Sequence, residues 1–167
     1  MLKPILDSLI AFLEMVFPFE VGTSGFYIVL GSAVGGMLVV ARLLSGVFGS
    51  SKGIVVAAFA VMIPLLLAAL GYVAVELYAL PEIKAEWATQ YLPWATFGIV
   101  FVLAGMFVSS KLWDFSKVPA IIALVLAGLA GMCLQYGAQM ILSVIDAGES
   151  QVEKRDRVLD ESIENAN

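Results

Sequence analysis

The sequence predicts an all-α membrane protein whose four transmembrane helices form two antiparallel hairpins. Hydrophobic residues fill 61% of the 167 positions and charged residues only 14%, and the mean hydropathy is +0.98. Soluble domains contain about 45–50% apolar and about 25% charged residues, and much of a small domain's surface must still face water. Four long apolar stretches alternate with short polar segments. Lipid is therefore the solvent that suits this chain.

The apolar stretches cover residues 26–48, 53–77, 93–113 and 118–145. A helix needs about 20 apolar residues to cross the hydrocarbon core, and each stretch is long enough. Within each half the stretches are joined by only a few residues, 49–52 in the first half and 114–117 in the second. Glycine or serine beside lysine favours a turn there, and short turns make neighbouring helices antiparallel. We expect residues 19–146 to form one transmembrane domain.

Residues 1–18 predict an amphipathic helix that lies in the membrane interface and ends near Pro18. Small or polar residues recur at helical spacing on one face, and apolar residues cover the remainder. The polar stripe comprises Lys3, Asp7, Ala11 and Glu14. A cleaved signal peptide is the competing interpretation. It is disfavoured because Asp7 and Glu14 interrupt the apolar region and no Ala-x-Ala site follows.

Residues 147–167 predict a polar, acidic and partly helical tail. This segment holds six acidic and three basic residues. One apolar stripe is compatible with a helix, and it comprises Val152, Leu159, Ile163 and Ala166. The tail is interpreted either as a solvated continuation of the last transmembrane helix or as a docking helix for a partner protein.

Aromatic residues mark the two expected membrane surfaces. Trp87, Tyr91 and Trp94 lie in or beside the connection 78–92, which predicts a short amphipathic interfacial segment, and Trp113 lies at a hairpin turn. Such rings are typical of the headgroup level, so we expect them to act as membrane anchors. Arg42 is also expected to be an anchor, because its long side chain can reach the headgroups. A pore-lining or lipid-phosphate role for Arg42 is the alternative.

Three polar residues inside the predicted helices are candidates for function. Gln135 and Gln139 lie four apart on one face of the fourth helix, so we expect them to face the bundle or another subunit as hydrogen-bonding partners. A polar pore lining is the alternative. Glu76 ends the second helix and is interpreted as an interfacial acid, or alternatively as a proton or cation site.

Small residues and one proline shape the predicted helix packing. The candidate packing positions are Gly31, Gly35, Gly36, Gly128 and Gly131. Gly31 and Gly35 form a G-x-x-x-G motif, which lets helices approach closely. Pro64 is expected to kink the second helix and to free a carbonyl group that a neighbouring helix can satisfy.

The composition excludes several classes of function. The chain has no histidine, and its single cysteine, Cys133, permits no intramolecular disulfide. The sequence contains no phosphate-binding glycine motif and no clustered carboxylates. We therefore expect no catalytic site, no cofactor and no metal site. A net charge of −5 with nine basic residues argues against nucleic-acid binding.

The distribution of lysine and arginine predicts the orientation. Arg42, Lys52, Lys111 and Lys117 lie near the two hairpin turns, whereas Lys3 and Lys84 lie near the other surface. The positive-inside rule then places the turns in the cytoplasm and both termini outside, in the periplasm if the membrane is a bacterial inner membrane. The three basic residues of the tail would reverse the count if included.

In layout, each half resembles the two-helix hairpin of conjugative pilins and of small membrane subunits of type IV secretion systems. The resemblance rests on the turns at 49–53 and 114–117, and the doubled hairpin departs from a pilin. The shortage of membrane-buried charge and the small-residue faces favour a non-catalytic subunit of a larger membrane assembly. The resemblance implies that this assembly is an envelope-spanning secretion or conjugation-type machine. The expected partners are the lipid bilayer and other membrane subunits. The alternative is a homo-oligomeric channel, holin-like pore or small transporter.

Overall fold

The computed structural model describes residues 2–83 and 85–164, and every regular element in that part of the chain is a helix. Helices α1, α2 and α3 span Leu2–Val16, Ser24–Val47 and Ile54–Ala74. Helix α3 continues through the π-helix η1 (Val75–Ala79) and the 3-10 turn η2 (Leu80–Glu82). Helix α4 (Glu86–Ala104) continues through the π-helix η3 (Gly105–Ser109) into α5 (Ser110–Trp113), and α6 spans Lys117–Glu164.

Within residues 2–83 and 85–164, four helices are long and apolar enough to cross a membrane, which confirms the predicted all-α membrane fold. Their bounds are Ser24–Val47, Ile54–Glu82, Glu86–Trp113 and Lys117–Ile145. The third of these spans, α4 with its continuation, begins at Glu86, which is two turns before the predicted apolar stretch that starts at Pro93. An acid suits the positive end of a helix dipole, so the helix extends beyond its apolar part. The chain is a multi-pass membrane protein.

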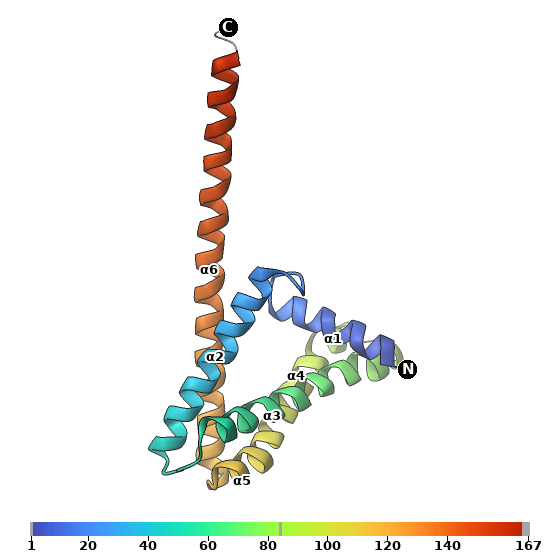
Figure 1. Cartoon of the computed structure of the whole chain (residues 1–167). Coiled ribbons are helices and arrows are strands. Elements are labelled where there is room, and N and C mark those ends of the chain that lie inside the picture. The colour runs from blue at the N-terminus through green and yellow to red at the C-terminus, as the bar shows by residue number, and fades with distance from the viewer. Residues whose placement is uncertain (1, 84, 165–167) are drawn as a thin grey trace.

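The four helices form two arms that meet at one end and diverge toward the other (Figure 1). Helix α2 packs along α6 in one arm, and α3 packs along α4 in the other. The turns predicted at 49–52 and 114–117 lie at 48–53 and 114–116. They join antiparallel neighbours at the end where the arms meet, which we call the tip. Each helix of the first hairpin nevertheless has its most extensive contact with a helix of the second.

Glycines allow the close contact between α2 and α6. A Cβ atom on Gly131 would lie 2.5 Å from Cγ of Met37 and 2.9 Å from the carbonyl oxygen of Ala33. A Cβ atom on Gly36 would lie 2.5 Å from Cδ1 of Leu134. At Gly131 the backbone of α2 is too close to admit a side chain, and at Gly36 a side chain would have to displace that of Leu134. Small residues promote helix association in lipid in this way.

A buried hydrogen bond compensates for the proline inside α3. Pro64 has no N–H group, so the carbonyl oxygen of Ala60 loses its helical donor. The Ser109 hydroxyl in η3 donates to that oxygen at 2.6 Å, and the bond is buried. The prediction that a neighbouring helix satisfies the freed carbonyl is confirmed.

Trp113 is fully buried at the tip, so its predicted role as a membrane anchor is wrong. Its neighbours in the core come from α2, α3 and α6, and most of them are alanines: Ala41, Ala57, Ala60, Ala120, Ala123 and Ala127. These small side chains leave room that the indole fills. Shape complementarity holds the ring, because its Nε1–H is buried with no hydrogen-bond partner among the described residues.

Helix α1 bridges the two arms at their diverging ends (Figure 1). Phe12 packs on Tyr72 of α3, with ring centroids 4.8 Å apart, and Phe17 packs on Phe26 of α2 at 5.8 Å. The four residues of the predicted polar stripe are all exposed, so the amphipathic pattern is confirmed. The apolar face contacts protein along much of its length, where lipid was expected, although the side chain of Leu6 remains exposed.

Helix α6 runs without a break past Ile145 to Glu164 and stands clear of the other helices in its second half (Figure 1). The expected helical continuation of the last span is thus present in the backbone. The apolar stripe predicted for the tail lies outside the residues whose side chains the structure describes.

Candidate functional site

A shallow apolar groove of about 410 Å³ lies on the surface of the α2–α6 arm. Its walls are Gly31, Ser32, Gly35 and Gly36 on α2, and Leu134, Gly137, Ala138 and Ile141 on α6. A Cβ atom on Gly31, Gly35 or Gly137 would have nothing within 4 Å. The backbone is therefore accessible along the groove, and a further apolar helix can approach it closely.

The five glycines predicted to pack helices divide into two sets. Gly36 and Gly131 are buried between α2 and α6. Gly31, Gly35 and Gly128 have open space beside them. Adjacent helix positions differ by about 100°, so Gly35 opens outward, whereas Gly36, at the edge of the groove, meets α6. The G-x-x-x-G motif thus faces away from the chain's own packing, and its role toward a partner stays a prediction.

Further glycines with a role in packing or in the groove were not among the predicted ones. Gly137 lines the groove, Gly71 lies against Val100 of α4, and Leu124 occupies the space beside Gly105. A Cβ atom on Gly71 would lie 3.2 Å from Cγ2 of Val100. The spacing Cys133-x-x-x-Gly137 repeats the small-residue pattern of α2 and was the available signal for Gly137.

Gln135 holds helix α1 to α6. Its side-chain Nε2 donates to the carbonyl oxygen of Val16 at 2.7 Å, at the end of α1 where helical carbonyls lack partners. The side chain is buried, whereas Gln139 one turn further is half-buried. The expectation that this face points into the protein holds for Gln135. Its amide is used within the chain, which removes half of the polar pair proposed for a pore lining.

The two ionisable candidates in the spans have different surroundings. Arg42 is half-buried, and its Nη1 donates to Oγ of Ser45 at 3.3 Å. The Ser45 hydroxyl in turn donates to the Arg42 carbonyl oxygen at 2.8 Å. Glu76 is exposed in the π-helix η1. The described residues contain no group of three metal-binding side chains, so Glu76 has no partners there for a metal site.

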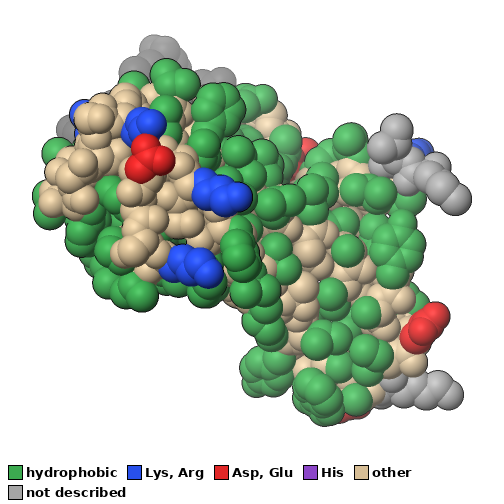
Figure 2. Space-filling view, turned by 90° about the horizontal axis from the view of Figure 1, so that it is seen from below, with side chains coloured by type: hydrophobic (Ala, Val, Ile, Leu, Met, Phe, Trp, Pro, Cys, Tyr) green, Lys and Arg blue, Asp and Glu red, His purple; other side chains and the backbone are tan. Residues whose placement is uncertain are grey.

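Basic side chains gather at the tip, where one acidic side chain lies against one of them (Figure 2). The paired groups are Nζ of Lys52 and Oδ2 of Asp114, 2.9 Å apart. Phe48 and Phe115 meet edge to face with ring centroids 5.7 Å apart. Both contacts join the first turn to the second, so they hold the two hairpins together at this end.

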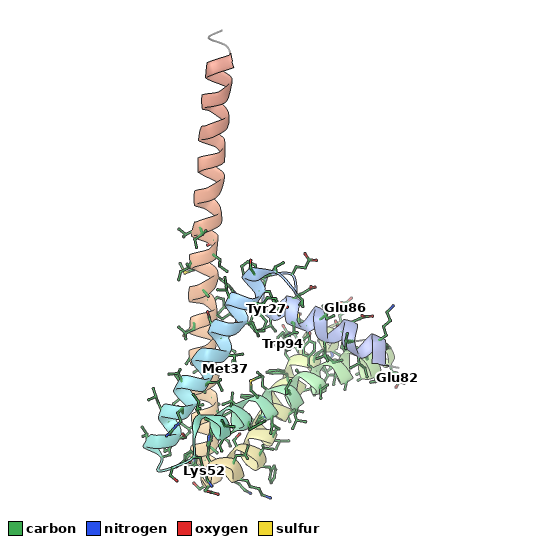
Figure 3. The ribbon with its side chains drawn as sticks, in the orientation of Figure 1. Tyr27, Met37, Lys52, Glu82, Glu86 and Trp94 are labelled. Atoms are coloured by element: carbon green, nitrogen blue, oxygen red, sulfur yellow. The ribbon has the colours of Figure 1, made fainter. Side chains whose placement is uncertain are left out.

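Aromatic and acidic residues occupy the end of the α3–α4 arm opposite the tip. Figure 3 shows Glu82 and Glu86 at that end, far from Lys52 at the tip. Trp87 and Tyr91 are exposed there. The partly exposed Trp94 packs edge to face on Tyr72, with ring centroids 5.1 Å apart. Their exposure suits the predicted anchoring role, which stays a prediction.

Comparison with protein-family models, with curated proteins and with solved structures finds no match to the chain.

Proposed function

We propose that this chain is a non-catalytic subunit that packs into a larger membrane-embedded assembly. The observation that carries the proposal is the outward-facing groove with Gly31, Gly35 and Gly137, where the backbone is open to a neighbour. A glycine inside a helix lowers stability by about 0.5–1 kcal/mol relative to alanine. Gly31, Gly35 and Gly137 have open space beside them, so close packing within the chain does not account for them. Their lack of side chains would allow the helix of another subunit to approach closely.

The length of α6 supports contact beyond the membrane as well. The helix has 48 residues, which corresponds to about 72 Å at 1.5 Å per residue. Its apolar span ends at Ile145, so residues 146–164 extend roughly 28 Å further. A helix that projects this far beyond the transmembrane domain can contact a partner outside the bilayer.

The charge distribution favours an orientation with the tip in the cytoplasm and both termini outside. In a bacterial inner membrane, α6 would then project into the periplasm, toward the outer parts of an envelope-spanning machine. The layout shared with the hairpin subunits of conjugation and type IV secretion systems points in the same direction. The alternative, a homo-oligomeric pore or transporter, has less support because Gln135 is engaged by Val16.

The test is to extract the tagged chain from its native membrane in mild detergent and to analyse the intact complex by native mass spectrometry. We expect other membrane subunits to accompany it in fixed stoichiometry. The double variant Gly31→Leu, Gly35→Leu fills the groove and should release them. Gly98→Leu is the matched control, because Gly98 is exposed on α4 with open space beside it.

A chain that extracts alone, or only with copies of itself, contradicts the subunit role. For a homo-oligomer, ion and solute flux in liposomes would test the pore or transporter role, with Gln139→Leu as the variant. Release of partners by Gly98→Leu as well would show that the groove is not the contact.

A further inference from the structure

Three basic side chains at or near the tip, Arg42, Lys111 and Lys117, form no ion pair with an acid among the described residues, and the two lysines are exposed. Lys52 forms an ion pair with Asp114, and Arg42 donates to Ser45. Lys111 and Lys117 are both exposed and belong to no ion pair in the described part of the chain. Figure 2 shows the basic side chains of the tip beside a hydrophobic surface.

One exposed aromatic ring connects these two lysines. Nζ of Lys117 lies 5.3 Å from the centre of the Phe107 ring. Phe107 and Lys111 are four residues apart in the continuous helix formed by η3 and α5, so they share one face. Phe107 thus lies close to the ammonium group of Lys117, the first residue of α6, and on the helix face that carries Lys111 of α5.

An apolar strip continues from the lysines toward the middle of the membrane. Leu103 precedes Phe107 by one turn on the same face of the helix, and both side chains are exposed. Val118 follows Lys117 and is 65% exposed. The polarity of the surface thus changes within two helical turns from apolar to cationic, in the same order as the acyl chains and phosphate of a lipid.

We propose that Lys111 and Lys117 bind the phosphate of an anionic phospholipid, with its acyl chains against Phe107 and Leu103. Lysine ammonium groups form charge-assisted hydrogen bonds with phosphate oxygens. A zwitterionic lipid presents a phosphate too, but its own cation offsets the attraction, so the site prefers a headgroup with net negative charge. This binding is independent of the subunit role proposed above.

The test uses the full chain in detergent, mixed with equal amounts of phosphatidylglycerol and phosphatidylcholine, with the lipids retained counted by native mass spectrometry. Each lysine near a membrane surface contributes about fivefold to anionic lipid binding. We therefore expect Lys111→Gln with Lys117→Gln to reduce the preference for phosphatidylglycerol by roughly 25-fold. Lys111→Arg with Lys117→Arg keeps both charges and should keep the preference, and Lys3→Gln should not alter it.

Equal retention of the two lipids by the unaltered chain would overturn the proposal, as would an unchanged preference in the glutamine variant. A thermal-shift series separates a lipid from free phosphate. We expect phosphatidylglycerol to raise the unfolding temperature and inorganic phosphate at millimolar concentration not to. An equal shift with inorganic phosphate would contradict a lipid site.

Discussion

Replacing Ser109 by alanine removes a single hydroxyl group that joins two transmembrane segments. In the native chain this hydroxyl donates to the Ala60 carbonyl at 2.6 Å. Pro64 lies four residues after Ala60 and offers no N–H, so the carbonyl depends on Ser109. The alanine side chain fits the same space, which means that the substitution changes hydrogen bonding with little change in packing.

The expected loss of stability follows from the environment of the carbonyl. Interhelical hydrogen bonds in membrane proteins contribute about 0.6 kcal/mol on average and up to about 1.7 kcal/mol. An acceptor that is left buried and unsatisfied costs about 1–3 kcal/mol. Ser109 is fully buried and the Ala60 side chain is as well, so water cannot readily replace the hydroxyl. We expect Ser109→Ala to lower the free energy of unfolding by about 1–2 kcal/mol.

The assay is equilibrium unfolding of the full chain in detergent micelles, titrated with a denaturing detergent and followed by circular dichroism. Trp113 is buried in the adjacent core, so its fluorescence provides a second signal for the same transition. Ser143→Ala is the matched control. Its exposed hydroxyl donates to the Met140 carbonyl within its own helix, and its removal should change stability by less than about 0.5 kcal/mol.

A double-mutant cycle with Pro64→Ala isolates the proposed cause. Alanine at position 64 restores the backbone donor for Ala60, so the hydroxyl of Ser109 becomes dispensable. In that background Ser109→Ala should cost less than about 0.5 kcal/mol, whatever Pro64→Ala does alone. An equal loss in both backgrounds would show that Ser109 matters for packing and would refute the orphan-carbonyl explanation.

Two further substitutions test the contacts of α6 in the same unfolding assay. Gly131→Ala should destabilise the chain by about 1–3 kcal/mol, because its Cβ would meet the backbone of α2, whereas Gly128→Ala has open space and should be neutral or stabilising. If both substitutions changed the free energy of unfolding equally, the close contact between α2 and α6 would not lie at Gly131. Gln135→Leu should cost about 1 kcal/mol and accelerate hydrogen exchange in α1, since the bond to Val16 is lost, and Gln139→Leu should leave that exchange unchanged. Unaltered exchange in the Gln135 variant would mean that apolar packing alone holds α1.

Features of the fold that depend on composition and on local rules were predictable. Four spans follow from the length of the apolar stretches, and the turns follow from glycine or serine beside lysine. The freed carbonyl near Pro64 follows from the missing N–H of proline. The exposed stripe of α1 follows from helical periodicity, because one of its faces is polar. Each of these features can be read from a single segment of chain.

Helix pairing was not predictable, because lipid and protein interior are equally apolar. In a soluble helix the hydrophobic face marks the core, but α3 is apolar on all sides, and periodicity does not tell which of its sides meets another helix. The burial of Trp113 has the same origin. Its position beside a turn suits an interfacial ring equally well, and only the alanines contributed by α2, α3 and α6 create the space that receives it.

The two small-residue faces of α2 connect the fold with the proposed function. Gly36 lies at the contact with α6, and Gly35, one position earlier, opens into the groove. Residues of α6 contribute to both, so the groove is formed by the same two helices that pack together at Gly36. Substitution at Gly36 should therefore impair folding, whereas substitution at Gly35 should impair assembly of a folded chain. If substitutions at Gly35 and Gly36 both impaired folding, the groove and the contact between α2 and α6 would form a single structural unit.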